Sequence, residues 1–222
     1  MRGVLAAIVA IFAFIGPLLG AGPIPQTPAD HIAHGGVTVP GWLVRPDGSD
    51  GTRHSLSFMT MGAGMHVTTG PAAILWNPDQ TAAGRYIVSA WFAPGRLPDG
   101  DPEAYGLFIG GADLKTERRQ YTCFVISRDG KFLITKRSGV QTKNLTATWA
   151  EHRAIRGFDP TGVLTNELAI RVGRAVVSFV VNGHEVASHP ASAVDTSGIV
   201  GIRVNHDVDM HVEGFSLQRA GA

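Results

Sequence analysis

The sequence predicts an all-β domain made of two stacked antiparallel sheets. Beyond Val37, apolar residues alternate with polar ones or form short unbroken runs, and almost no stretch repeats at helical spacing. The chain of 222 residues holds 28 glycines, roughly one residue in eight against a norm near 7%. Short apolar runs separated by glycine, proline, asparagine and aspartate are typical of strands joined by tight turns.

Thirteen segments share this pattern and are predicted as strands. They are residues 41–45, 56–60, 66–68, 73–76, 85–92, 105–109, 120–128, 131–136, 167–172, 175–181, 184–188, 199–204 and 208–218. So many strands in one domain imply two sheets packed face to face.

Two dipeptides predict tight hairpins, because Asp129-Gly130 and Asn182-Gly183 both supply the positive φ angles of a type I′ turn. Registers counted from Asn182-Gly183 and from Gly173-Arg174 agree on which side chains share a face. They pair Phe179 with Val186 and with Leu168, and Ile170 with Val177. The sequence thus predicts a three-strand meander with one buried side, formed by Leu168, Ile170, Val177, Phe179 and Val186.

A last hairpin is predicted around Asn205, His206 and Asp207. The inward pairs would be Val204 with Val208, Ile202 with Met210 and Val200 with Val212. On the opposite face Arg203 would lie opposite Asp209, and Gly201 would leave room beside His211. These polar residues predict either the floor of a groove or a solvated salt bridge worth under about 1 kcal/mol.

The N-terminus predicts export. Arg2 precedes an apolar run, a Gly-Pro breaker and small residues, the order of a secretory signal. We expect residues 1–21 to be this signal, 22–36 a proline-containing flexible linker and 37–222 the domain, in a secreted or periplasmic protein. Glycine and proline interrupt the apolar segment, so no transmembrane span is expected after cleavage, although an uncleaved anchor is the alternative.

Charge and cysteine content exclude several classes of protein. The chain has 19 basic and 18 acidic side chains, so nothing in its charge predicts binding to nucleic acid. The single cysteine, Cys123, excludes an intramolecular disulfide framework and a zinc site built on cysteines.

The sequence resembles concanavalin A-like jelly rolls. The resemblance is carried by segments 105–109, 121–126 with the turn at 129–130, 166–170, 177–183 and 198–202. It is similar to laminin G-like modules and to the bacterial 3-keto-disaccharide hydrolase domain, and it spans roughly residues 86–217. It implies a jelly-roll sandwich whose concave sheet often holds glycans, and therefore a carbohydrate or cell-envelope component as partner.

This resemblance selects candidate binding residues on the concave sheet. They are Tyr105, Tyr121, Arg137, Arg203, Asp209 and His211, the alternatives being tyrosines buried in the core and charges on solvated edges. Aromatic rings stack on the C–H face of sugars while polar groups fix orientation. No cofactor is predicted other than calcium, for which Asp99, Asp101 and Glu103 offer oxygen ligands at alternate positions, the alternative being an ordinary acidic turn.

Catalytic motifs are missing from the sequence. The paired-glutamate strand of family 16 glycoside hydrolases, the Gly-x-Ser-x-Gly elbow and the four-residue histidine spacing of zinc proteases are all absent. A non-catalytic binding module is therefore favoured. The alternatives are a sugar hydrolase or lyase of the 3-keto-disaccharide type, with Asp209 or Glu103 as base and His211 as acid, and a structural or partner-binding domain.

Overall fold

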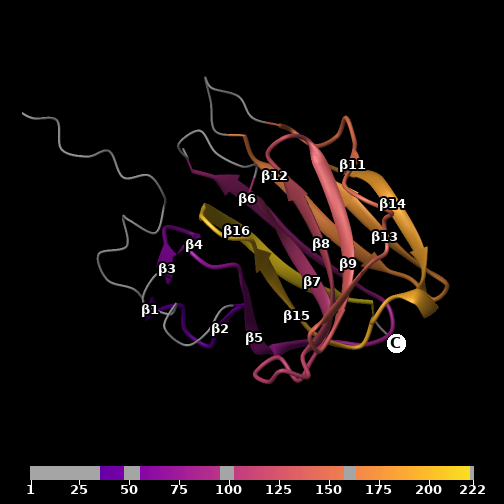
Figure 1. Cartoon of the computed structure of the whole chain (residues 1–222), viewed down its shortest axis with the longest axis horizontal. Coiled ribbons are helices and arrows are strands. Elements are labelled where there is room, and N and C mark those ends of the chain that lie inside the picture. The colour runs from indigo at the N-terminus through magenta and orange to yellow at the C-terminus, as the bar shows by residue number, and fades with distance from the viewer. Residues whose placement is uncertain (1–35, 48–55, 96–102, 158–163, 221–222) are drawn as a thin grey trace, which may run out of the picture.

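Two β-sheets stack on one another with an apolar core between them (Figure 1). The computed structural model describes residues 36–47, 56–95, 103–157 and 164–220. The predicted signal segment and nearly all of the predicted linker lie outside these residues, as do Asp99 and Asp101. Among the residues described, no helix has the length and apolarity needed to cross a membrane.

Sheet A has eight strands and is antiparallel except where β1 runs parallel to β3. In spatial order its strands are β1 (Gly36–Val37), β3 (Leu56–Met61), β4 (Gly64–Thr69), β16 (Val208–Arg219), β6 (Tyr86–Pro94), β12 (Asn166–Val172), β13 (Val176–Val181) and β14 (His184–Pro190). A single 3₁₀ turn, Ala191–Ala193, follows β14 within the described chain.

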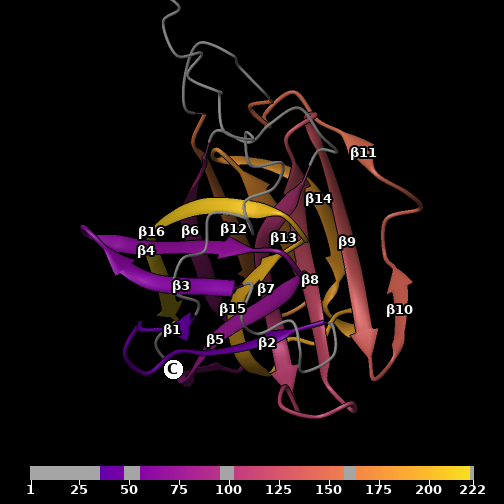
Figure 2. The ribbon, with the colours of Figure 1, turned by 60° about the vertical axis from the view of Figure 1, so that its left-hand side comes forward.

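Sheet B is antiparallel throughout and also has eight strands. Its spatial order is β10 (Gln141–Asn144), β9 (Lys131–Ser138), β8 (Gln120–Ser127), β7 (Ala104–Ala112), β15 (Gly198–Val204), β5 (Ala73–Ala82) and β2 (Leu43–Pro46), with the short β11 (Ala150–Glu151) also pairing with β9. Figure 2 shows β10 at the right-hand edge of this sheet, beside β9.

The inner faces of both sheets supply the core because their strands alternate inward apolar and outward polar residues. Phe124 of sheet B meets Phe179 of sheet A with ring centroids 5.4 Å apart. The predicted meander is confirmed as β12, β13 and β14, and four of its five inward residues are fully buried, while Val186 is partly buried against them. Each buried side chain of this size contributes about 1.5–3 kcal/mol.

The registers within the meander differ from those predicted. Phe179 lies opposite Ile170 and Ala187, instead of Leu168 and Val186. The β12–β13 turn is wider than expected, since the Gly173 N–H donates to the Val176 carbonyl, and a bulge between Phe179 and Val180 shifts β14 by one residue. Asn182 and Gly183 do adopt positive φ angles, of 49° and 81°. In the β8–β9 turn Gly130 has a positive φ angle but Asp129 does not, so the prediction of a type I′ turn there was wrong.

The predicted C-terminal hairpin is wrong, because β15 belongs to sheet B and β16 to sheet A. The connecting residues bond to other strands, with Asn205 N–H donating to the Ala104 carbonyl and Asp207 N–H to the Gly70 carbonyl. The apolar residues of both strands still point into the core. Arg203 and Asp209, however, lie on different sheets.

Candidate functional site on the outer face of sheet B

The outer face of sheet B, which points away from the core, carries a second apolar cluster. It contains Ile74, Trp76, Ala104, Phe108, Leu114, Tyr121, Cys123 and Val125. Leu114, from the loop after β7, and the partly buried Trp149 cover these strand residues. Polar groups on this face are therefore held in a partly dry environment, where each needs a partner.

Gly201 is required at the centre of this face. A Cβ atom there would lie 2.6 Å from the Phe108 ring and 2.4 Å from the Leu75 carbonyl oxygen. The space that the sequence predicted beside His211 is thus filled by Phe108, which also contacts Tyr121 with ring centroids 5.4 Å apart.

Three arginines converge on Asp47, the residue after β2. Arg203 Nη2 is 2.7 Å from Asp47 Oδ2, Arg119 Nη2 is 3.5 Å from Asp47 Oδ1, and Arg137 Nη1 is 3.9 Å from Asp47 Oδ2. Strand alternation explains the convergence, because Arg203 on β15 and Arg137 on β9 both occupy outward positions. Tyr121 lies directly opposite Arg137 on β8.

Glu117 extends the arrangement by pairing with Arg45 and with Arg119, the latter at 3.1 Å. We call the six charged residues Arg45, Asp47, Glu117, Arg119, Arg137 and Arg203 the Asp47 cluster. Four guanidinium groups and two carboxylates give it a formal charge of +2. The Arg45 Nε, Arg119 Nε and Arg203 Nη1 atoms are buried without a hydrogen-bond partner in the described part of the chain.

The charges of the cluster set its protonation states. Burial raises the pKa of Asp47, but Arg203 and, after it, Arg137 and Arg119 outweigh burial, so that the pKa lies below its ordinary value of 3.8. Burial raises the pKa of the Tyr121 phenol, with Arg203 opposing it. At neutral pH the site therefore offers charged guanidinium donors and a neutral phenol, a set suited to the hydroxyl and carboxylate oxygens of a ligand.

A cavity of about 470 Å³ adjoins the cluster at the β2 edge of the sheet. It is lined by Gly36, Val37, Leu43, Val44, Arg45, Pro46, Leu56, Trp76 and Lys115. Apolar walls with an indole ring and two cations match the composition of a small-molecule site.

Tyr105 is not part of this face, because it lies in the core between the sheets. It is 2% exposed, its ring packs against Phe92, and its hydroxyl receives a hydrogen bond from Asn166 Nδ2 at 3.3 Å. Burial raises the pKa of Tyr105 to about 12. Of the six predicted binding residues, Tyr121, Arg137 and Arg203 come together.

Asp209 and His211 lie on the outer face of sheet A, so the predicted Arg203–Asp209 pair is wrong. Asp209 Oδ1 instead lies 2.7 Å from His66 Nε2, and His211 Nε2 lies 2.9 Å from Glu213 Oε1. The two imidazole rings are 6.2 Å apart. Both pairs are partly exposed.

The structure describes only one of the predicted calcium ligands, Glu103. Its Oε1 atom lies 3.1 Å from His206 Nδ1, and the residue is 7% exposed. Within the described residues, no group of three or more histidine, cysteine, aspartate or glutamate side chains is placed to hold a metal ion. Burial raises the pKa of the Cys123 thiol, which bonds Thr135 Oγ1 at 3.0 Å, as expected for a structural cysteine.

Arg45, Asp47, Glu117 and Arg119 were not predicted as site residues. The last three lie outside the strands, and each of the four has a partner that is distant in sequence. One faint signal was available: Leu43, Arg45 and Asp47 alternate with inward Val44 and Pro46, which places Asp47 on the outward face.

No protein-family model and no curated protein matches the sequence. Solved structures do match the fold. The carbohydrate binding module CBM66 from Bacillus subtilis aligns with a TM-score of 0.57 and 10% identity, covering 82% of this chain and 96% of that one. A Bacillus subtilis protein of unknown function with a galectin-like fold gives a TM-score of 0.56 and 13% identity, covering 80% and 88%.

The exoplasmic/lumenal domain of VIP36, in its Ca²⁺/Man3GlcNAc-bound form, gives a TM-score of 0.52 and 10% identity, covering 85% of this chain and 88% of that one. These similarities concern the fold, because every identity is far below 25%. The all-β architecture and these neighbours show that the chain has a concanavalin A-like jelly-roll fold.

Proposed function

We propose that this protein is an exported saccharide-binding module whose contact surface is the outer face of sheet B at the Asp47 cluster. The observation that carries the proposal is the convergence of four guanidinium groups on two carboxylates, next to a cavity with an indole wall. The guanidinium N–H donors outnumber the local carboxylate acceptors, so the cluster can donate to the oxygens of a ligand.

Arg137 and Arg203 are the proposed contact residues, and the buried Tyr121 flanks Arg137 on the neighbouring strand. Arg137 donates through Nε to the Gly139 carbonyl at 2.9 Å, while its Nη1 atom only approaches Asp47. Its guanidinium thus keeps donor capacity for a sugar hydroxyl or carboxylate. The printed names of two fold neighbours, a carbohydrate binding module and a Man3GlcNAc-bound domain, support a saccharide ligand.

A glycan array tests the proposal with the purified protein, Arg137→Gln and a matched control. Arg153→Gln removes the same charge from an exposed position away from the cluster. We expect binding of at least one glycan by the protein and by Arg153→Gln, reduced at least tenfold in Arg137→Gln. Absence of binding to every glycan, or equal binding by both variants, would contradict the proposal.

Calcium is tested on the same array with added Ca²⁺ and with EDTA. Binding lost in EDTA and restored by Ca²⁺ would support the calcium loop proposed at Asp99, Asp101 and Glu103. Binding unchanged by EDTA would remove calcium from the proposal.

Export is tested at the chain terminus. We propose that residues 1–21 direct secretion and are cleaved after Ala21. Terminal sequencing of protein recovered from the periplasm or medium should then begin at Gly22. Recovery from the cytoplasm with Met1 retained would contradict export.

A second candidate function is the cleavage of a sugar by a hydrolase or lyase reaction. It is favoured by the His211–Glu213 and His66–Asp209 pairs, since proton transfer requires such hydrogen-bonded geometry. Incubation of the array ligand and a 3-keto-disaccharide with the protein tests it. Products lost in His211→Ala would support catalysis, and unchanged sugars would exclude it for these substrates.

A further inference from the structure

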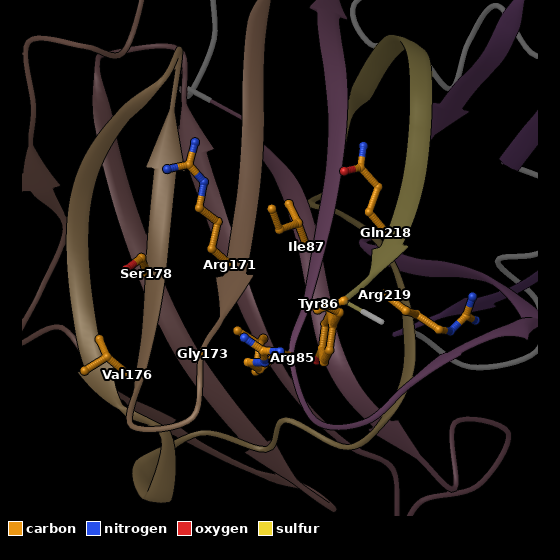
Figure 3. A pocket seen from close by; sticks show the side chains of 11 residues that line it. Arg85, Tyr86, Ile87, Arg171, Gly173, Val176, Ser178, Gln218 and Arg219 are labelled. Atoms are coloured by element: carbon orange, nitrogen blue, oxygen red, sulfur yellow. The ribbon is translucent and has the colours of Figure 1, made fainter. Parts of the chain in front are cut away.

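The outer face of sheet A has a cavity of its own, of about 400 Å³. Strands β6, β12, β13 and β16 line it near the ends where Tyr86, Val172, Val176 and Arg219 lie. Figure 3 shows Arg85 in the middle of this pocket beside Tyr86, with Ser178 and Val176 to one side. It is on the opposite side of the sandwich from the Asp47 cluster.

The charge of this pocket is uncompensated. Arg85, Arg171 and Arg219 line it, and no carboxylate is among its lining residues. Arg219 is engaged, donating from Nε and Nη2 to the Thr81 carbonyl at 3.1 and 2.6 Å, and it points away from Arg85 in Figure 3. The side chains of Arg85 and Arg171 form no hydrogen bond or ion pair with any residue that the structure describes, although the Arg85 carbonyl accepts a hydrogen bond from Ala220 N–H.

Two such guanidinium groups in one concave site favour an anion. A planar fork of N–H donors matches the oxygens of a carboxylate or a sulfate ester, and binding would neutralise cations that otherwise repel one another. Ser178 and Gln218 add neutral donors and acceptors at the rim.

Trp91 lies further along the same face of β6. It is 42% exposed, which is unusual for a tryptophan in the middle of a sheet. Trp91 and Ile87, at the pocket, are four residues apart, or about 13 Å along a strand. Between them Ser89 and Ser216 share a hydrogen bond of 3.1 Å.

Acceptor groups flank this indole. Glu167 and Glu213 are the direct cross-strand neighbours of Trp91. An exposed ring between two carboxylates offers a stacking platform with acceptors for sugar hydroxyls, whereas a carboxylate or sulfate would be repelled there. The face therefore has an acidic end around Trp91 and a cationic end at Arg85 and Arg171.

We propose that the outer face of sheet A is a second binding site, for an anionic saccharide. One carboxylate or sulfate ester occupies the pocket at Arg85, and a neutral sugar ring stacks on Trp91. Arg171, which extends away from Arg85 in Figure 3, adds positive charge to the wall of the same pocket. This site is independent of the Asp47 cluster, so its occupancy does not require the proposed function at that cluster.

Isothermal titration calorimetry tests the proposal with two anionic probes, a cello-oligosaccharide carrying one terminal uronate and the same oligosaccharide carrying one terminal sulfate ester, and with the neutral cello-oligosaccharide. We expect binding of one anionic probe at least tenfold tighter than the neutral probe. The anionic probe that binds identifies carboxylate or sulfate as the recognised group. Failure of both anionic probes to bind overturns the proposal.

Variants distinguish binding at this pocket from a general effect of charge and from binding at the Asp47 cluster. Arg85→Gln/Arg171→Gln should weaken binding at least tenfold, and Trp91→Ala at least threefold. The control Arg118→Gln/Arg153→Gln removes the same charge from exposed positions elsewhere and should leave the affinity unchanged. Arg137→Gln should also leave it unchanged, which distinguishes failure here from failure at the Asp47 cluster. Equal weakening by the control pair would overturn the proposal.

Discussion

The outer faces of the two sheets follow the same alternation but have opposite environments. On sheet B, Phe108 and Tyr121 are 0% and 2% exposed, because Leu114 and Trp149 cover the strands. On sheet A, Trp91 is 42% exposed on an uncovered face. Burial on sheet B makes its polar groups depend on one another, whereas the partly exposed ion pairs of sheet A contribute little to stability.

The largest expected contrast is between the two aromatic residues. Phe108→Ala should lower the free energy of unfolding by about 4 kcal/mol, because it opens a cavity in the apolar cluster over Gly201. Trp91→Ala should change it by less than about 1 kcal/mol. Urea denaturation of both variants checks this, and similar losses would refute the difference between the faces.

Asp47→Asn should have the next largest effect, a loss of about 3 kcal/mol at pH 7, because three guanidinium groups lose their counter-ion. Folding depresses the pKa of Asp47, so its stabilising contribution is complete above the unfolded value of 3.8 and disappears as pH falls through the lower folded value.

Urea denaturation of wild type and Asp47→Asn across pH provides the measurement. The difference in unfolding free energy should be constant from neutral pH to about 5 and shrink below the unfolded pKa of the carboxyl. A difference that grows under acid conditions would contradict the assignment.

Gly201→Ala should cost about 2 kcal/mol, because the added methyl collides with the Leu75 carbonyl and the Phe108 ring. Gly157→Ala is the milder comparison, since its added methyl would make a tight contact of 3.3 Å with the Arg128 carbonyl oxygen but no collision. Thermal unfolding should separate the two variants. Comparable stability of both would show that Phe108 does not pack over Gly201.

The smallest expected effect is that of Asp209→Asn on sheet A. This residue pairs with a partly exposed histidine, so the loss should be under about 1 kcal/mol. Glycan binding at the Asp47 cluster should be unaffected, because Arg203 pairs with Asp47. A loss of glycan binding as large as that of Arg137→Gln would contradict the placement of Asp209 away from Arg203.

Local patterns were enough to predict the two-sheet fold and the inward residues of the meander, β15 and β16. Alternation tolerates errors of register: Phe179 meets Ile170 instead of Leu168, yet the inward set is the same. A shift by two residues preserves the face, and the bulge beside Val180 absorbs the shift by one.

Alternation could not predict which sheet a strand joins. The inward valines of β15 and β16 fit a hairpin and a crossing between sheets equally well, so the Arg203–Asp209 pair followed from the wrong choice. Half of the Asp47 cluster lies in the segments beside strands, whose positions depend on long-range pairing. Tyr105 was misplaced for a related reason, because an aromatic residue fits either face of a strand.

The most direct test of the central claim is a map of NMR amide shifts on titration with the glycan that Arg137→Gln fails to bind. We predict that the perturbed amides centre on Tyr121, Arg137 and Arg203. Perturbations confined to sheet A, with those three residues unchanged, would contradict the placement of the saccharide site on sheet B.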